Sequence, residues 1–475
     1  MHKKKCKKSA KKMRVKVQGG ARLRGEVNAP PSKSYTHRAV AVAALAEGKS
    51  EVLFPLVSED TKATFNAAEC LGAVVEYDES ARRLRVRGVA GKPRAPEDVL
   101  NAENSGTTLR FFTAISGLCS DPATAVATVL TGDASLRTRP NAPLLKSLNE
   151  LGSEAYSTKG DGTAPLVVKG GLKGGETTLD GSVSSQFVSA LLLACPLAER
   201  DTHILAKNLA SVPYTKMTLE VLEQAGVEIP FSRSRSSGSG DFSFQVAGGR
   251  KYELRRFVVP GDFSSASYLL AAAAVTDSEV RVRNLFPSAQ GDARIVEVLK
   301  EMGVEVKWEK ERGVVSVRGR GAEKGKLKLK GLKVELRENP DLVPTVAVLG
   351  ALAEGRTEIT GVAHLRYKET DRLRLLTEEL GKMGARVEER RDGLLVVGKE
   401  GEALKPAKVN SHGDHRLAMA LCVAGLSASA GSSASAGAEE TVVEGAECAK
   451  VSYPSFFEDL VSLGVSLGAE VKSEE

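Results

Sequence analysis

The chain has 475 residues, of which 42% are hydrophobic and 27% are charged, a composition typical of a globular protein with large hydrophobic cores. No run of about 18 apolar residues occurs, which excludes a transmembrane helix. Residues 1–12 hold seven of the 67 basic residues and no acid, so the remaining 60 basic residues balance 60 acidic ones. This neutral body argues against a nucleic-acid-binding surface.

The lysine-rich segment at the start of the chain is expected to be a disordered tail covering residues 1–12, with Met13 as an alternative start. It has neither the apolar stretch of a secretory signal nor the Arg/Ser pattern of an organelle transit peptide. The six cysteines form no C-x-x-C pair. We therefore expect a cytoplasmic protein with reduced thiols.

A glycine-centred segment recurs six times along the chain. Each copy follows an amphipathic run and precedes alternating apolar and polar residues, which predicts the end of a helix leading into a strand. The glycines are 80, 74, 77, 81 and 84 residues apart, at Gly72, Gly152, Gly226, Gly303, Gly384 and Gly468. This near-constant spacing predicts six α/β units, arranged as two domains of three.

A short polar cluster precedes an apolar run in each of these units. Ser, Asn, Asp and Thr before an apolar run favour a helix start, and a helix N-terminus attracts anions. If these helix starts converge, they form an anion-binding site. In chain order the clusters are Pro31 to Ser34, Asn104 to Thr107, Ser182 to Gln186, Gly261 to Ser265, Asn339 to Asp341 and His412 to Arg416.

Basic residues accompany several of these clusters. Lys33 and Arg38 lie at the beginning of a helix expected to continue to Leu45, and Arg110 follows the second cluster by one turn. Arg137 and Arg139 stand on a loop just before another expected helix. Arginine is suited to forked contacts with carboxylate or phosphate, so this pattern favours an anionic ligand.

The segment Lys368-Glu369-Thr370-Asp371-Arg372 is the most specific charged motif. At helical spacing Lys368 and Arg372 would share one face beside Glu369. The segment His412 to His415 contains residue types that can bind a metal ion, but no other cluster has the spacing of metal ligands. No metal is therefore expected.

These motifs together resemble the 5-enolpyruvylshikimate-3-phosphate synthase family of enolpyruvyl transferases. The resemblance runs from about Val15 to the last repeat. It is carried by Pro31 to Ser34 with Arg38, Asn104 to Arg110, Asp180 to Phe187, Gly261 to Ala274, Lys368 to Leu373, and Asp414 to Met419.

The resemblance implies an α/β fold of two inside-out α/β barrels, built from six βαβαββ repeats, three per domain. Helix N-termini would point into the cleft between the domains, which would hold the active site. The chain would cross between the domains near Pro31 and near Gly261. One discontinuous domain would then comprise residues 13–31 and 261–475, and the second would comprise residues 32–260.

The activity implied is that of a 3-phosphoshikimate 1-carboxyvinyltransferase of the shikimate pathway, which leads to chorismate and the aromatic amino acids. The enolpyruvyl group of phosphoenolpyruvate moves to the 5-hydroxyl of shikimate 3-phosphate by addition and elimination, and phosphate is released. The implied partners are these two small molecules, with no cofactor, nucleic acid or membrane, and the expected state is a monomer. Gly106 leaves space consistent with a glyphosate target.

The resemblance also implies roles for individual residues. Asp341 is expected as the base and Glu369 as the acid, with Lys33 able to assist either step, a division that the sequence leaves open. Shikimate 3-phosphate would contact Lys33, Ser34, Arg38, Ser184, Ser185, Gln186, Ser211, Tyr214, Asp341, His364 and Lys368. Phosphoenolpyruvate would contact Lys33, Asn104, Gly106, Arg139, Gln186, Arg372, Asp414, Arg416 and Lys450.

Three features depart from the usual family pattern. Asn is common where His364 stands, and Phe111 replaces a frequent Pro. A lysine usually stands three residues before the C-terminal proline, whereas Lys450 stands four before Pro454.

Two alternative functions remain at this point. UDP-N-acetylglucosamine 1-carboxyvinyltransferase shares the chemistry but carries a cysteine on a mobile loop, and the matching loop here, Thr131 to Pro140, has none. A non-enzymatic or RNA-end-binding repeat protein should have lost the cleft cations, which this chain retains.

Overall fold

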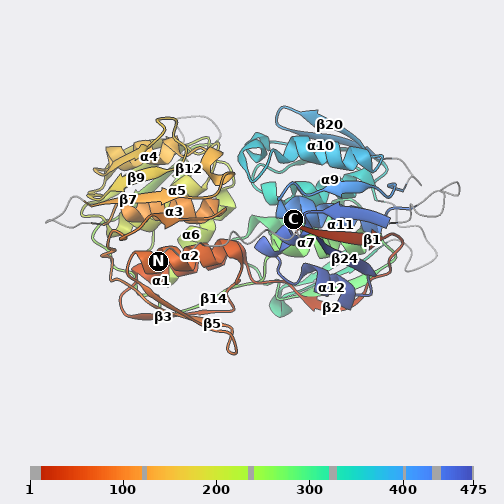
Figure 1. Ribbon diagram of the computed structural model, residues 1–475, viewed down its shortest axis with the longest axis horizontal. Helices are drawn as coiled ribbons and strands as arrows, with labels where there is room; N and C mark the ends of the chain where they lie inside the picture. The colour runs from red at the N-terminus through yellow and green to blue at the C-terminus, as the bar shows by residue number, and fades with distance from the viewer. Residues whose placement is uncertain are drawn as a thin grey trace, which may run out of the picture.

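The computed structural model describes residues 12–119, 126–233, 240–319, 329–398, 403–429 and 440–472, which form two lobes side by side (Figure 1). Residues 1–11 of the expected tail lie outside these ranges, and Lys12 already begins the first strand. Within the described ranges, no helix combines the length and the apolar character needed to cross a membrane.

The described part of the chain contains six four-stranded sheets, which all have the same topology. In every sheet the first two strands are parallel and the other pairings are antiparallel, as a βαβαββ unit requires. The sheets of the first lobe are, in spatial order, β14 (Arg256–Val258), β3 (Lys49–Leu53), β5 (Arg83–Arg87) and β4 (Val74–Asp78); β6 (Leu100–Asn101), β7 (Ala127–Thr131), β9 (Leu166–Lys169) and β8 (Glu154–Ser157); and β10 (Gly175–Asp180), β11 (Thr202–Lys207), β13 (Phe242–Val246) and β12 (Phe231–Arg233). Those of the second lobe are β2 (Arg24–Asn28), β15 (Glu279–Arg283), β17 (Val314–Arg318) and β16 (Glu305–Glu309); β18 (Lys333–Glu335), β19 (Gly355–Thr360), β21 (Gly393–Gly398) and β20 (Arg386–Arg390); and β22 (Lys408–Asn410), β23 (Glu440–Glu444), β1 (Lys12–Gln18) and β24 (Leu467–Lys472).

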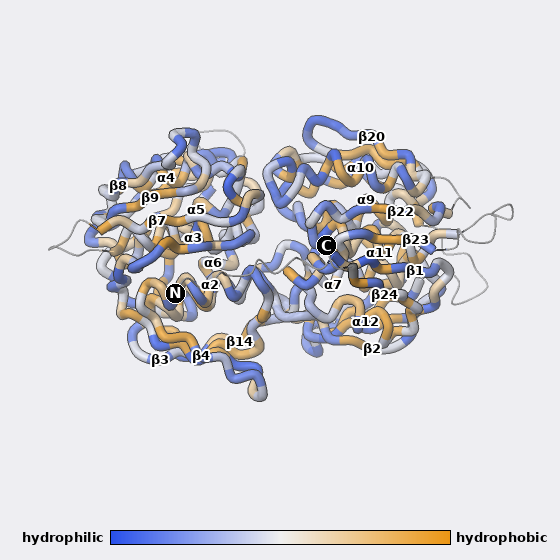
Figure 2. The backbone as a smooth tube through the Cα atoms, viewed as in Figure 1, coloured by the Kyte–Doolittle hydropathy of each residue, from blue (hydrophilic) through white to orange (hydrophobic). Residues whose placement is uncertain are grey.

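Each unit contributes one inner helix that is wholly or almost wholly buried. Such helices are apolar on all sides, and hydrophobic stretches accordingly run through both lobes (orange in Figure 2). The inner helices are α1 (Lys33–Leu45), α3 (Gly106–Ser116), α5 (Gln186–Ala194), α7 (Phe263–Val275), α9 (Val343–Ala351) and α11 (His415–Leu426). Each begins at or just after one of the six predicted polar clusters.

The second helix of each unit is buried on one side only. These outer helices are α2 (Glu59–Cys70), α4 (Ala142–Glu150), α6 (Val212–Gln224), α8 (Ile295–Glu301), α10 (Arg372–Lys382) and α12 (Phe456–Ser462). Short 3-10 helices connect the elements: η1 (Leu136–Thr138), η2 (Cys195–Leu197), η3 (Gly291–Arg294), η4 (Lys310–Arg312), η5 (Pro340–Leu342), η6 (Ala363–Tyr367) and η7 (Ala446–Val451).

A left-handed glycine follows five of the outer helices at the predicted positions, from Gly72 to Gly384. The sixth prediction was wrong, because Gly468 lies inside β24. Gly464, with a φ of 98°, is the residue that follows α12. The dipeptide Leu-Gly occurs twice here, at Leu463 and again at Leu467. The second copy matches the repeated sequence pattern, although it is the first that ends the helix.

The chain exchanges strands between its ends and its middle. β14 follows the third unit but pairs with β3 of the first, while the N-terminal strands β2 and β1 complete the fourth and sixth sheets. Pro31 and Gly261, the predicted crossing points, pair with each other in an isolated bridge. One hydrophobic core takes its residues from Tyr35 to Val259, and the other from Val15 to Ala29 and Phe263 to Val465. We propose that these two cores define the two domains.

A second glycine recurs at the end of a strand, and none of the sequence motifs marks it. It follows the strand at the centre of the antiparallel part of the sheet and touches the end of an inner helix. A Cβ on Gly319, after β17, would lie 1.8 Å from the carbonyl oxygen of Ala273 and 2.3 Å from that of Thr276. A Cβ on Gly88, after β5, would lie 2.3 Å from the carbonyl oxygen of Ala46. Strand and helix can approach this closely only without a side chain.

Replacing Gly319 tests this close approach. Gly319→Ala should lower the free energy of unfolding by roughly 1–3 kcal/mol or more, because the methyl group would overlap backbone carbonyls. Gly381→Ala is the matched control, because nothing lies within 4 Å of the new Cβ on α10. This control should be neutral or stabilise by up to about 1 kcal/mol. Equal stability of the two variants in urea unfolding would contradict the packing argument.

Candidate active site

The N-terminal ends of the inner helices from both lobes meet at one cleft. Helix starts carry unpaired N–H groups and partial positive charge, so their convergence favours a bound anion. The cleft is lined by Lys33, Ser34, Arg38, Asp60, Gly106, Thr107, Arg110, Arg139, Ser184, Ser185, Gln186, Ala210, Ser211, Tyr214, Asp262, Asp341, His364, Tyr367, Lys368, Glu369, Arg372, His415, Arg416 and Ser452.

The lining is also cationic through its side chains. It contains seven Lys and Arg residues against four Asp and Glu residues. Three lining carboxylates pair with these cations: Asp60 with Lys33 in the first lobe, and Asp341 with Arg372 and Arg416 and Glu369 with Arg372 in the second. A dianionic or trianionic ligand would therefore find an excess of positive charge.

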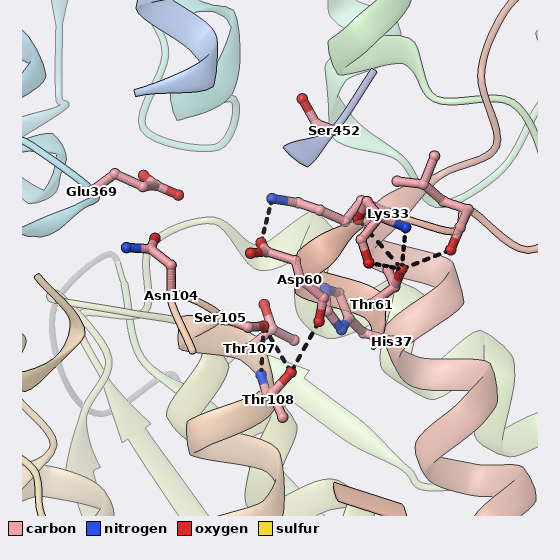
Figure 3. A network of polar contacts seen from close by, with 12 residues as sticks. Lys33, His37, Asp60, Thr61, Asn104, Ser105, Thr107, Thr108, Glu369 and Ser452 are labelled. Atoms are coloured by element: carbon pink, nitrogen blue, oxygen red, sulfur yellow. Dashed lines mark hydrogen bonds and ion pairs between the residues drawn. The ribbon is translucent and has the colours of Figure 1, made fainter. Parts of the chain in front are cut away.

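Lys33 begins α1 and bonds across to α2. Its Nζ donates to Asp60 Oδ2 at 3.0 Å, and both side chains are almost buried. Figure 3 shows Glu369 of the opposite lobe extending toward the same space as Lys33 and Asn104. No sequence motif indicated Asp60, because it lies on an outer helix away from every polar cluster.

Arg139 is fixed by the loop before α3. It donates to the side chain of Asn104 at 2.9 Å and to Ser135 Oγ at 3.1 Å. Ser135 Oγ in turn donates to the backbone oxygen of Glu369 at 3.2 Å, which joins the two lobes. Asn104, which is not among the lining residues, thus orients Arg139.

Gln186 and Arg110 form a second polar pair in the first lobe. Arg110 donates to Gln186 Oε1 at 2.6 Å, and the Gln186 amide donates to Thr107 Oγ1 at 3.0 Å. Burial first, and then repulsion by Arg139, lower the pKa of Arg110 to about 9. Arg110 was singled out as part of a motif but not as a predicted ligand residue.

Arg38 is fully engaged inside the first lobe. It donates to Thr218 Oγ1 at 2.8 Å, to the backbone oxygen of Ser34 at 2.9 Å and to that of Tyr214 at 2.8 Å. Its guanidinium also lies 5.3 Å from the centre of the Phe111 ring. Arg38 therefore holds α1 and α6 together while lending positive charge to the cleft.

Arg372 is the centre of the second lobe's charge network. It donates to Asp414 at 2.8 Å, to Asp341 at 3.1 Å and to Glu369 at 2.6 Å. Arg416 donates to the other oxygen of Asp341 at 2.6 Å. Asp414 is wholly buried behind the lining, where it also caps α11.

The helical spacing expected for Lys368 to Arg372 was wrong. Helix α10 begins only at Arg372, and Asp371 is its N-cap, accepting from the backbone nitrogen of Arg374. Lys368 and Glu369 therefore lie in the turn after η6. An Asp is a strong N-cap, so the helix starts there rather than earlier.

The charges fix the protonation of the cleft groups. Burial opposes ionisation of Glu369, but Arg372 and its neighbours outweigh it and hold the pKa well below its usual range. In the same way Arg416 and Arg372 keep the pKa of Asp341 low despite burial. Burial, with Lys368, lowers the pKa of His364 to about 3, and burial with Lys33 lowers that of His415. At neutral pH Asp341 and Glu369 are therefore ionised, and His364 and His415 are neutral.

Several buried polar atoms of the lining have no partner among the described residues. These atoms are Arg139 Nε, His364 Nε2, His415 Nε2, Arg416 Nη1 and Ser452 Oγ. Buried polar groups are normally paired, so atoms left free in a cleft point to a ligand that satisfies them.

The structure brings together sixteen of the predicted site residues in the cleft lining. Asn104 and Asp414 are not among the lining residues, but each accepts a hydrogen bond from one of them, Arg139 and Arg372 respectively. Lys450 is exposed and is not part of the lining, whereas Ser452, two residues later, is. The lining also includes Asp60, Arg110 and His415, which were not predicted as ligand residues.

The sequence is similar to those of known proteins over nearly its full length. The family model of EPSP synthase (3-phosphoshikimate 1-carboxyvinyltransferase) matches residues 17–460. The chain belongs to the EPSP synthase family. The 3-phosphoshikimate 1-carboxyvinyltransferase of Methanosarcina acetivorans is 50% identical, covering 96% of this chain and 99% of that protein. That of Methanococcoides burtonii is 49% identical over 96% of this chain and 99% of its own length.

Solved structures also match the fold. An EPSP synthase from Acinetobacter baumannii superposes with a TM-score of 0.77 at 28% identity, covering 97% of this chain and 100% of that chain. The enolpyruvyl transferase NikO from Streptomyces tendae has a TM-score of 0.72 at 18% identity, covering 97% of this chain and 100% of its own, and shares the fold. The predicted two-domain, inside-out α/β class is thereby confirmed.

Removing Arg372 tests the charge network without any substrate. Arg372→Leu should lower the free energy of unfolding by about 3–5 kcal/mol at neutral pH, because the buried carboxylate of Asp414 and the part-buried ones of Asp341 and Glu369 lose this cation. Those carboxyls would then have raised pKa values, so the folded state would bind more protons than the unfolded chain. Stability of this variant should therefore recover in part as the pH falls from about 7 to about 5.

Arg374→Leu is the matched control on the same helix. Arg374 pairs with Glu378 in solvent at 3.0 Å, and loss of such a pair should change stability by less than about 1 kcal/mol. Denaturant unfolding at several pH values measures both variants. Equal and pH-independent losses would show that the buried network does not stabilise the fold.

Proposed function

We propose that the cleft transfers the enolpyruvyl group of phosphoenolpyruvate to the 5-hydroxyl of shikimate 3-phosphate, with release of phosphate. The observation that carries this assignment is the meeting of Lys33, Arg139, Arg372 and Arg416, from both lobes, around the ionised pair Asp341 and Glu369. Two anionic substrates repel each other, so their encounter needs cations on every side.

Shikimate 3-phosphate is proposed to bind on the side of α5 and α6. Ser184, Ser185 and Ser211 precede these helices and offer hydroxyl and backbone donors to a phosphate. Ser34, Arg38, Gln186 and Tyr214 complete this side with Lys33, and Lys368, His364 and Asp341 face it from the other lobe.

Phosphoenolpyruvate is proposed to bind next to it, between Lys33 and Gly106 of one lobe and Arg372 and Arg416 of the other. Arg139 and Gln186 complete this side. A Cβ on Gly106 would lie only 3.3 Å from the Arg139 guanidinium, so glycine keeps the space open. We propose that Ser452 Oγ, which is buried and unpartnered, contacts the phosphate in the position expected for Lys450.

The reaction requires a base for the 5-hydroxyl and an acid for the methylene carbon. Asp341 is ionised and fixed by Arg372, Arg416 and Tyr214, which suits it to accept the hydroxyl proton as the new C–O bond forms. Proton delivery to the methylene carbon gives a tetrahedral intermediate. Removal of a methyl proton and cleavage of the C–O bond to phosphate then regenerate the enol ether.

Glu369 is proposed to carry the methylene proton. In the free cleft Arg372 keeps Glu369 ionised through their contact at 2.6 Å. The anionic groups of phosphoenolpyruvate would engage Arg372 and weaken that contact, which raises the pKa of Glu369 and allows it to hold a proton. Lys33 lies on the opposite side of the cleft and can assist either step.

The addition and elimination steps use side chains of the cleft alone, so the proposal includes no cofactor. We also propose a monomer that acts in the cytoplasm on two small molecules. The nucleotide-sugar alternative is not favoured, since the loop from Thr131 to Pro140 lacks the cysteine typical of that enzyme.

A substrate comparison tests the assignment. Incubation with phosphoenolpyruvate should release phosphate when shikimate 3-phosphate is the acceptor and should release none with UDP-N-acetylglucosamine. Turnover with the nucleotide sugar alone would overturn the acceptor assignment.

Glu369→Gln tests the proposed acid. The amide keeps the size of the side chain but cannot deliver the proton, so kcat should fall by about 10²–10⁴-fold while KM changes much less. Glu378→Gln, on the exposed face of α10, is the control and should keep wild-type kinetics. A normal kcat for Glu369→Gln would transfer the acid role to another group, with Lys33 the first candidate.

A further inference from the structure

Asp292 is a buried carboxyl group at the interface of the two lobes, outside the cleft lining. It lies on η3 and is 3% exposed. The hydroxyl of Tyr214, from the opposite lobe, lies 3.1 Å from Asp292 Oδ2 and 2.7 Å from Asp341 Oδ2. Ser264 Oγ bonds the same oxygen of Asp292, while Oδ1 has no partner among the described residues.

The number of hydrogen atoms available for bonding decides whether Asp292 and Asp341 can both be ionised beside the Tyr214 hydroxyl. A tyrosine hydroxyl has one hydrogen, so it can donate to only one of the two carboxyl groups. If both were ionised, one negative oxygen would face the lone pairs of the phenol, next to a carboxyl group that is only 3% exposed. One of the two carboxyl groups must therefore carry a proton.

The neighbouring charges show which carboxyl group is protonated. Asp341 accepts bonds from two guanidinium groups, those of Arg372 at 3.1 Å and Arg416 at 2.6 Å. Asp292 has no ion pair in the described part of the chain and contacts only hydroxyl groups. The proton therefore belongs to Asp292.

We propose that Asp292 is a positioning residue held as a neutral carboxylic acid, which donates to the Tyr214 hydroxyl so that Tyr214 donates to the base, Asp341. The chain of bonds runs from the second lobe to the first and back. It fixes the carboxylate of Asp341 in one orientation and ties that orientation to the contact between the lobes.

The electrostatic surroundings agree with a neutral Asp292. Burial raises its pKa to about 7, and the negative charges of Asp341 and Asp262 act in the same direction, against the lowering by Ser264 and Arg416. Loss of the proton would put a second negative oxygen against Tyr214 and disturb both the base and the lobe contact. The proposal rests on the role of Asp341 in the proposed function.

The neutral isostere distinguishes a protonated acid from a structural residue. In the wild type, kcat/KM should fall about tenfold between pH 7 and pH 8.5 as Asp292 loses its proton. Asp292→Asn keeps a neutral donor, so its kcat/KM should not fall over this range. Asp292→Ala should lose activity at every pH, and Asp98→Asn, an exposed carboxyl elsewhere in the first lobe, should keep the wild-type profile.

Two readouts need no turnover, so they separate this proposal from the proposed function. The folded state binds a proton on Asp292 that the unfolded chain has released above a pH of about 4, so this group makes stability fall as pH rises from about 4 to about 7. Asp292→Asn should flatten that slope in thermal unfolding. Infrared difference spectra at pH 6 should show a carboxylic C=O band in the wild type that is absent from Asp292→Asn.

The proposal is overturned if Asp292→Asn keeps the wild-type pH dependence of both kcat/KM and stability, or if it lacks activity as completely as Asp292→Ala. Absence of the carboxylic band would also overturn it. If the band and the stability slope are present but the enzyme does not turn over shikimate 3-phosphate, the protonation of Asp292 stands and the proposed function fails.

Discussion

Electrostatic repulsion is the constraint on which the rest of this structure depends. Seven cationic side chains face one cleft, and without partners they would repel one another in a site with little water. The protein offsets this repulsion with its own carboxylates, above all through Arg372, which contacts Asp341, Glu369 and Asp414 at once. The carboxylates are therefore both stabilising partners and candidate proton carriers. Anionic substrates can compete with them for the same cations, so binding can change their protonation.

The inside-out fold explains how such a cleft is built. Each unit buries one apolar helix, so the polar and partially positive start of that helix is the end left to face the cleft. Strand-end glycines such as Gly319 let the helix and sheet approach closely at the other end. Neither lobe alone surrounds a ligand, since Lys33 and Arg139 come from one and Arg372 and Arg416 from the other. The contacts of Tyr214 and Ser135 across the interface show how the two halves are held in register.

The sequence predicted those parts of the site that depend on local patterns. Polar residues before an apolar run predicted the starts of the inner helices, and short charged motifs singled out Lys33, Arg139, Arg372 and Arg416. The roles of these four residues came from the family resemblance. Features that depend on packing between distant segments were not predictable in this way. Asp60 and Asp292 lie next to the site only because α2 and η3 pack there, and nothing in their own neighbourhood distinguishes them from surface carboxylates. The local sequence pattern gave wrong predictions at two places. Gly468 matches the repeat but lies inside a strand, and Lys368 lies before the helix because the N-cap Asp371 starts the helix only at Arg372.

The central claim is that anionic substrates replace the cleft carboxylates as partners of cations from both lobes. A crystal structure with shikimate 3-phosphate and an unreactive phosphoenolpyruvate analogue tests it most directly. We expect both ligands side by side in the cleft, bonded to Lys33, Arg139, Arg372 and Arg416, with the Arg372 guanidinium turned from Glu369 toward the analogue. Ligands held by one lobe only, or an Arg372 that keeps its contact with Glu369 and none with a ligand, would contradict it.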